Sequence, residues 1–302
     1  MAVAFSAIGA AELALLAKDR PIIGANIIPR TPTVERWTEV GAITDTDRTE
    51  TGYPVHRVYD GDPDVESKPN GARDPYYVVF DLGAAYTIDF VCIIGHNLST
   101  AGVVNVDLDI DYTGDTGDGS FGSYYRAPVS TNPSSDDRIM QLDLMHTGSD
   151  ALRYTGVRYV RLRLNKGSAF TPQINELVIG HRRQLKTPPM SPFNPQQWMH
   201  DQTVAKSRGH SIDITQWSRN AFVLDASFSV WQDAYITDIK EWWKQVYGSF
   251  IWIWEPYTYP DSWHLMALEQ DVLIFPSEGF TERTLEVHAV EQGPETWLLE
   301  NE

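Results

Sequence analysis

Short apolar runs separated by turn-forming residues dominate the chain from Ile22 to about Gln184. Between Val104 and Tyr112, aliphatic residues alternate with Asn and Asp, so one face is apolar and the other carries every acid. This period of two predicts a half-buried strand whose acids lie on the face away from the core. Four runs are predicted to be strands: Val78–Leu82, Ile88–Gly95, Val103–Ile110 and Tyr159–Leu164. No long helical pattern interrupts them, so we expect a β-sandwich.

A different pattern follows the proline-rich segment 185–197, which lacks periodicity and is predicted to be an extended linker. Ala221–Trp231 alternates as a strand, and Asp233–Gly248 has apolar residues at helical spacing with Gly248 at the expected stop. Further strands are predicted at Phe250–Trp254, His264–Leu268, Val272–Phe275 and Thr284–Val290. These elements predict a smaller α+β unit with one helix against a sheet.

Both ends of the chain are predicted to be arms. Apolar residues near helical spacing precede Pro21 and indicate a short docking helix, and the last residues mix acids with Trp297, Leu298 and Leu299. The predicted organisation is an N-terminal helix and arm at 1–30, a β-sandwich at 31–184, a linker at 185–197, an α+β domain at 198–293 and an acidic tail at 294–302.

Composition narrows the function classes. Of 302 residues, 42% are hydrophobic, which suffices for packed cores, and the net charge of −17 disfavours binding to nucleic-acid phosphates. No segment reaches the roughly 18 to 20 apolar residues of a membrane helix, so we expect no membrane insertion. The first residues lack the pattern of a secretion signal. The single cysteine, Cys92, lies in an apolar run and cannot form an internal disulfide.

Five segments in order carry a family resemblance: Tyr59–Asp62 (YDGD), Tyr77–Gly83 (YVVFDLG), Ile88–Asn97 (IDFVCIIGHN), Tyr159–Leu164 (YVRLRL) and Ile174–Gly180 (INELVIG). Over roughly residues 50–183 the chain resembles the galactose-binding-like jelly roll of the discoidin and coagulation-factor type C family. The resemblance implies a jelly-roll β-sandwich. The fold class expected for the chain is therefore mainly β, with this sandwich followed by a smaller α+β domain.

The variant with DLG followed by IDFVCIIGHN is similar to modules found in structural proteins of phage tails. Ala221–Glu291, with its Gly248-Ser249-Phe250 turn, resembles the tail-tube-like domains of phage distal-tail and hub proteins. These resemblances imply a virion tail protein that assembles in the host cytoplasm with copies of itself and with other tail proteins.

The jelly-roll resemblance also implies a structural Ca²⁺, while no cofactor is required. Asp60, Asp62 and Asp64 on the turn, together with Glu176 of the closing strand, would supply the oxygen ligands that this ion prefers. The alternative is that these aspartates form ordinary turns, their side chains accepting nearby backbone N–H groups.

Two sets of aromatic residues are candidates for binding surfaces. Relatives that bind sugars use loops at one end of the sandwich, and here Phe121, Tyr124, Tyr125 and Arg126 follow a Gly/Asp-rich loop. Packing against a neighbouring subunit is the alternative for that loop. The predicted interface residues are Trp252, Trp254, Trp297, Leu298 and Leu299. Trp252 and Trp254 share one face of a strand whose other face is also apolar, which fits either an interface or a core covered on both sides.

The sequence contains no motif of a known catalytic site, neither a nucleophile elbow, a zinc helix, a phosphate loop nor a Cys-x-x-Cys pair. His96 ends a predicted strand, and we expect its imidazole to bond a turn. The absence of these motifs favours a non-enzymatic protein, and the phage-tail resemblances imply a structural protein of a tailed phage at the distal tail. It is expected to assemble into a ring, with the jelly roll serving for spacing, decoration or weak glycan contact. The alternatives are a monomeric carbohydrate-binding module for a cell-surface glycan and a capsid-decoration protein.

Overall fold

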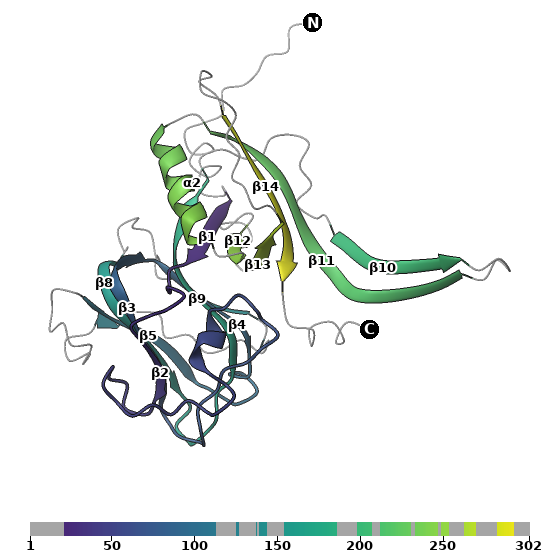
Figure 1. Ribbon diagram of the computed structural model, residues 1–302. Helices are drawn as coiled ribbons and strands as arrows, with labels where there is room; N and C mark the ends of the chain where they lie inside the picture. Colours follow the sequence, from purple (N-terminus) through teal and green to yellow (C-terminus); the bar gives the residue numbers. More distant parts are fainter. Residues whose placement is uncertain are drawn as a thin grey trace, which may run out of the picture. The chain divides into compact units, whose positions relative to one another are not determined.

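The computed structural model describes residues 21–112, 125–126, 137, 139–143, 154–185, 198–206, 212–230, 233–246, 249–253, 263–269 and 283–292. Over this part of the chain the fold is mainly β, with antiparallel sheets and one α-helix (Figure 1). The chain divides into two compact units. Ala25–Arg182 forms the jelly-roll unit, and the segment ending at Gly24 joins Arg183–Gln292 in the second unit.

The jelly-roll unit is a sandwich of two sheets. One sheet has five strands in the order β2-β3-β8-β5-β6, and the opposing layer contains β9, β4 and β7 as neighbours. The elements are β2 (Val34–Thr38), the 3-10 helix η1 (Val55–Val58), β3 (Tyr76–Ile88), β4 (Phe90–His96), β5 (Asn105–Tyr112), β6 (Tyr125–Arg126), β7 (Ile139–Asp143), β8 (Tyr154–Asn165) and β9 (Ile174–Gln184).

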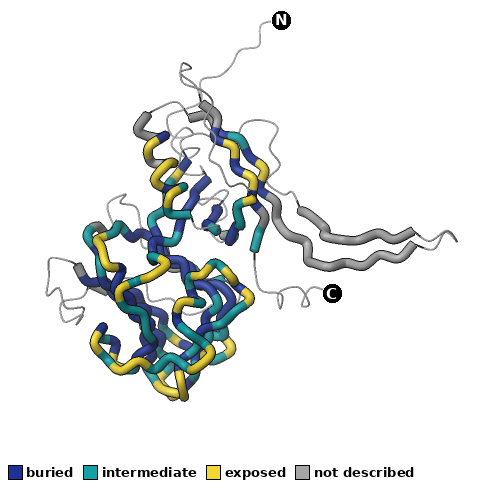
Figure 2. Tube along the Cα trace, viewed as in Figure 1, coloured by how far each residue is buried: buried dark blue, intermediate teal, exposed yellow. Residues whose placement is uncertain are grey.

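Alternate residues of these strands fill the space between the two sheets. The innermost side chains are fully buried and come from both layers: Phe80, Val106, Leu108, Val160, Leu162, Ile93, Leu177 and Ile179. In Figure 2 the buried residues of this unit lie on its strands, and the exposed ones lie mainly in the connecting loops. The mainly β class and the sandwich expected from the sequence are confirmed.

The outer face of the five-stranded sheet differs from the prediction. Asp107, Asp109 and Asp111 of β5 lie opposite the core, yet they are only 4%, 0% and 1% exposed. Arg161 Nε donates to Asp109 Oδ2 at 2.7 Å, and Arg163 Nη1 donates to Asp107 Oδ2 at 3.1 Å. The neighbouring strand β8 thus supplies arginines in register with two of these acids.

A loop after β2 covers part of this outer face. Ile43 packs in a small buried cluster with Tyr77, Val79 and Tyr159, and the carbonyl of Gly41 accepts a hydrogen bond from Arg161 Nη1 at 3.1 Å. Gly41 has a φ of +92°, and a Cβ there would lie 2.9 Å from the Tyr77 ring. Asp107 and Asp109 can be buried because Arg163, Arg161 and this loop take the place of water around their carboxylates.

The second unit combines one helix with a sheet. Its strands follow the order β10-β11-β14-β13-β12-β1, and Ile22–Gly24 of β1 pair with Ile251–Ile253 of β12. The elements are β1 (Ile22–Asn26), β10 (Trp198–Lys206), β11 (Ile212–Val230), α2 (Asp233–Gln245), β12 (Ser249–Ile253), β13 (Trp263–Leu268) and β14 (Arg283–Gln292).

Helix α2 is amphipathic, as its sequence pattern predicts. Ile236, Ile239 and Trp242 are buried, whereas Lys240 and Lys244 are exposed. The Trp242 ring meets Phe250 of β12 edge-on, with the centroids 5.3 Å apart. None of the helices described is long and apolar enough to cross a membrane.

The longest strand of this unit changes partner halfway along. β11 pairs with β10 from Ile212 to Phe222, and with β14 from Val223 to Val230. In Figure 1, β10 and the first part of β11 run away from the other strands of this unit as a two-stranded ribbon. At about 3.3 Å per residue, the ribbon is roughly 35 Å long.

Several predicted elements lie outside the described residues: the docking helix before Pro21, the strand Val272–Phe275, the linker after Leu185, Gly248 and the C-terminal tail. The predicted arm at 1–30 contains a strand, β1, that the sequence pattern did not indicate. The strand predicted at Ala221–Trp231 begins earlier, at Ile212, and its partner β10 was also not predicted.

Loss of the buried ion pair between Asp109 and Arg161 is expected to destabilise the jelly-roll unit. Asp109→Ala leaves Arg161 buried without its carboxylate, and we expect it to lower the free energy of unfolding by about 3–5 kcal/mol. Urea denaturation followed by circular dichroism measures this loss. Glu241→Ala, which removes an exposed ion pair with Lys244 on α2, is the control and should change little. Equal stability of the two variants would contradict the buried-pair account.

Candidate functional site

The turn Asp60–Asp64 is held by its own aspartates. Asp60 Oδ1 accepts the N–H of Asp62 at 2.9 Å, and Asp62 Oδ1 accepts the N–H of Asp64 at 3.1 Å. Gly61 has a φ of +84°, which glycine adopts without strain. The interpretation of Asp60 and Asp62 as turn-forming residues is therefore confirmed.

Glu176 of β9 lies beside this turn and is only 1% exposed. Its Oε2 accepts the N–H of Gly61 at 3.1 Å. Burial raises the pKa of Glu176 well above its usual range; the Gly61 N–H lowers it, and the charges of Asp60 and Asp62 raise it further. Burial also raises the pKa of Asp60. His56 and Arg57 partly offset this rise for Asp60, whereas the charges that act on Glu176 are those of two carboxylates.

The predicted calcium ligands fit an ion only in part. The structure brings Glu176 close to Asp60 and Asp62, but the described residues contain no group of three or more His, Cys, Asp or Glu side chains placed to hold a metal ion. The buried carboxylate of Glu176 is suitable oxygen chemistry for Ca²⁺. The backbone group shown against it is the N–H of Gly61, which is a hydrogen-bond donor and no ligand for an ion.

The predicted sugar-binding residues are only partly within the described structure. Phe121 and Tyr124 lie outside the described residues. The backbone of Tyr125 and Arg126 forms β6, which pairs with Asp109 and Ile110 of β5 and is the last strand of its sheet within the described part of the chain.

The predicted interface residues require one correction. Trp252 is fully buried within a single copy of the chain, 6.1 Å from the Phe228 ring, so it belongs to the core of the second unit. Ile251 and Ile253 on its other face are also buried, which is the two-sided core that the sequence left open. Trp254, Trp297, Leu298 and Leu299 lie outside the described residues.

A turn after β4 is organised by His96. Its Nδ1 accepts the N–H of Leu98 at 3.3 Å, which confirms the predicted role of bonding a turn. Asp137 completes the turn, since its carboxylate accepts the N–H of Ser99 at 2.6 Å and that of Thr100 at 3.1 Å.

Sequence reasoning missed a chain of polar side chains across the neighbouring loops. Asn97 Nδ2 donates to Gln173 Oε1 at 3.2 Å, and Gln173 Nε2 donates to Glu66 Oε1 at 3.3 Å. Glu66 lies 3.5 Å from Lys68 Nζ, which in turn lies 3.6 Å from the centroid of the Tyr53 ring. These five residues come from four separate segments, so no spacing in the sequence signals the network.

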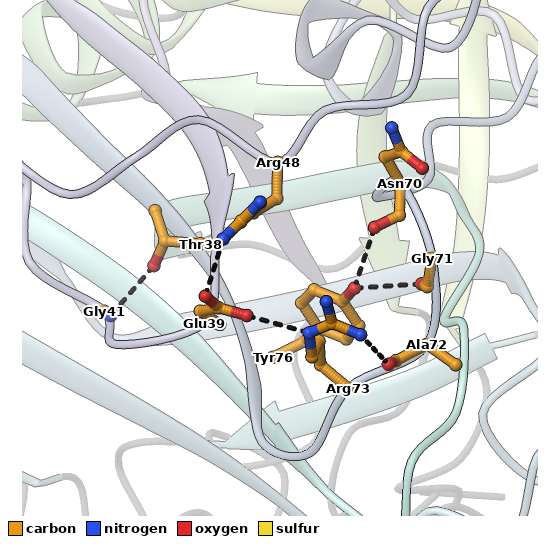
Figure 3. Close-up of polar contacts among 9 residues, drawn as sticks. All are labelled: Thr38, Glu39, Gly41, Arg48, Asn70, Gly71, Ala72, Arg73 and Tyr76. Carbon is orange, nitrogen blue, oxygen red and sulfur yellow. Dashed lines mark hydrogen bonds and ion pairs between the residues drawn. The ribbon is translucent and has the colours of Figure 1, made fainter.

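A second polar cluster, centred on Glu39, lies in the loops before β3 (Figure 3). Arg48 Nη2 donates to Glu39 Oε1 at 2.8 Å, and Arg73 Nε donates to Glu39 Oε2 at 3.0 Å. Tyr76 holds the loop that carries Arg73, because its hydroxyl donates to the carbonyl of Gly71 at 2.9 Å. The hydrogen bond from Arg48, assisted by the charges of both arginines, lowers the pKa of Glu39.

The chain is similar to several solved structures. No protein-family model and no curated protein matches it. A family 32 carbohydrate-binding module of Clostridium perfringens NanJ, solved with galactose, is 13% identical, with a TM-score of 0.38; the match covers 53% of this chain and all of the module. Chitosan-binding module 1 of a Paenibacillus chitosanase/glucanase is 14% identical, with a TM-score of 0.37, over 52% of this chain and 98% of the module.

An enzyme structure is also similar. A Ruminococcus gnavus GH29 fucosidase matches at 14% identity and a TM-score of 0.33, over 43% of this chain and 22% of the fucosidase. Similarity at this level carries no argument about function.

The raised pKa of Glu176 predicts a pH dependence of stability. The folded chain keeps a proton that the unfolded chain releases above the ordinary glutamate pKa, so stability falls as pH rises from there through the folded-state pKa. Glu176→Gln has no proton to release at this position, so its stability should not fall with rising pH for this reason. In the presence of chelator, we expect the variant to melt several degrees above the wild type at neutral pH, and the difference to shrink towards pH 4. Parallel melting curves across this range would refute the assignment.

Proposed function

We propose that this chain is a non-enzymatic structural protein of a tailed-phage particle, assembling into a ring at the distal tail through its second unit. The resemblance of the jelly roll and of Ala221–Glu291 to phage tail modules supports this placement. In this proposal the partners are copies of the chain and neighbouring tail proteins, and assembly takes place in the host cytoplasm.

The two-stranded ribbon of β10 and β11 is the observation that carries the proposal. Within the described residues, β11 pairs only with β10 from Ile212 to Phe222, and β14 joins from Val223. A two-stranded ribbon is marginally stable in water without a third strand or a surface to pack on. A second protein surface would stabilise it.

The free edge of β10 offers a means of contact. β10 is the last strand of its sheet within the described residues, so one row of its backbone N–H and C=O groups is available for pairing. Addition of a strand to such an edge is a common mode of protein association. The proposal therefore places the subunit contact on the ribbon, whereas the buried Trp252 stabilises the unit itself.

Removal of the ribbon is expected to abolish assembly. The variant replaces residues 201–219 with an Asn-Gly turn between His200 and Asn220, which face each other in the hairpin. Native mass spectrometry over a range of concentrations should show a discrete oligomer for the wild type and a monomer for the variant. Replacing only residues 207–211 with a Gly/Ser loop retains the ribbon and serves as the control. A wild type that stays monomeric, or a variant that assembles like it, would contradict the proposal.

Glycan binding by the jelly-roll unit is the second candidate function. The polar network from Asn97 to Lys68 favours it, because amide, carboxylate and ammonium groups meet there at partly exposed loop positions. Such groups are suited to sugar hydroxyls. In a tail protein this contact would be to a glycan of the host surface, and in a monomer it would make the chain a carbohydrate-binding module.

We further propose that the turn at Gly61 and the Glu176 carboxylate hold a structural Ca²⁺. The ion would supply the positive charge that the buried carboxylate lacks. We expect Ca²⁺ at about 1 mM, the upper end of the dissociation constants of extracellular calcium sites, to raise the melting temperature of the wild type. Glu176→Gln, which has lost the charged ligand, should not respond. Equal responses of the two proteins would place the ion elsewhere.

A further inference from the structure

The Glu39 carboxylate is held between two arginines that come from different loops. Each of its oxygens accepts a hydrogen bond from a different guanidinium, Arg48 on one side and Arg73 on the other (Figure 3). The three side chains remain partly accessible, with exposed fractions of 32% for Glu39, 38% for Arg48 and 55% for Arg73. The arrangement is therefore open to exchange with a ligand.

Neither arginine gives Glu39 a paired hydrogen bond, although Arg73 Nη1 also donates to the carbonyl of Ala72 at 2.8 Å. A guanidinium offers a planar pair of N–H groups that matches the two oxygens of one carboxylate. Glu39 takes a single hydrogen bond from each arginine instead. Within the part of the chain that the structure describes, the buried Nε of Arg48 has no acceptor. Once Glu39 moves away, Arg48 can pair two of its N–H groups with one ligand carboxylate.

The positive and negative charges of the cluster do not cancel. Two guanidinium groups face one carboxylate, which leaves one positive charge on a chain whose net charge is −17. The negative field of the whole chain repels anions in general. An anion that binds here must therefore gain specific contacts with the two arginines.

We infer that Arg48 and Arg73 form a binding site for the carboxylate of an acidic sugar, and that Glu39 occupies this site until the ligand displaces it. The inference rests on the second candidate function, glycan binding by the jelly-roll unit. The exposed side chain of Asn70 lies beside the cluster, since its backbone N–H bonds the carbonyl of Arg48. A carboxylate with neighbouring hydroxyls defines a uronic or sialic acid.

Displacement of Glu39 costs little free energy. Ion pairs between partly exposed side chains contribute little to stability, because water solvates both charges almost equally well. Glu39 follows β2 directly, in a turn where Thr38 Oγ1 accepts the N–H of Gly41 at 2.8 Å, so the turn holds without the carboxylate of Glu39.

Calorimetric titration of the full chain with trigalacturonate tests the inference, and the methyl ester of the same trimer is the neutral control. The wild type should bind the acid and not the ester. Glu39→Gln removes the internal competitor at nearly constant shape and should bind the acid about two- to fivefold more tightly, because the ion pairs that compete are those of partly exposed side chains. Arg73→Ala should weaken binding at least about tenfold.

Two further variants separate the geometry of the site from its charge. Arg48→Lys keeps the positive charge but loses the paired N–H groups, so it should bind as weakly as Arg73→Ala. Lys166→Ala removes a cation from the same unit outside both the cluster and the Asn97 network and should leave affinity unchanged. Thermal melting of each variant verifies the fold.

The outcomes distinguish this site from glycan binding in general. Equal binding of acid and ester would retain glycan binding and overturn the carboxylate site. Acid binding that is unchanged by Glu39→Gln would also overturn it, since Glu39 would then not occupy the site. Failure of every variant to bind either trimer would overturn both the site and the glycan-binding function for this sugar class.

Discussion

The antiparallel pairing of β3 with β8 is the interaction on which the jelly-roll unit depends. On the inner side it aligns Phe80 with Val160 in the core, and on the outer side it places Arg161 beside Val79, within reach of Asp109 on β5. The same pairing holds the ends of both strands in register. It therefore positions the loop of Arg73, which precedes β3, against the loop that follows β8, where the Arg73 N–H bonds the carbonyl of Phe170 at 3.1 Å.

The sequence predicted the apolar positions of these strands more reliably than their surroundings. Alternation in β5 correctly assigned Val106, Leu108 and Ile110 to the core, because side-chain direction follows from strand geometry alone. Whether the opposite face meets water depends on residues more than 50 positions away, such as Arg161, and on the loop of Ile43. The same limitation hid the Glu39 cluster, the Asn97 network and the strand β1, since each forms only when distant segments meet.

The two units divide the proposed functions between them. In the jelly roll, buried ion pairs and the turns at His96 and Gly61 fix the loops, and the polar groups that remain partly exposed there are the ones suited to a ligand. In the second unit, Trp242, Phe250, Phe228 and Trp252 are buried within a single chain. Among the described residues of this unit, the ribbon is the part that has only two strands, so the proposal places assembly on β10 and β11.

Hydrogen–deuterium exchange of the ribbon amides, measured on the assembled chain and on the same chain at high dilution, tests this central claim most directly. The account predicts that residues 198–206 and 212–222 exchange rapidly when dilute and become protected on assembly, while the core strands β3 and β8 stay protected in both states. Protection of the ribbon that equals the core strands at high dilution, or a ribbon that exchanges rapidly in both states, would contradict it.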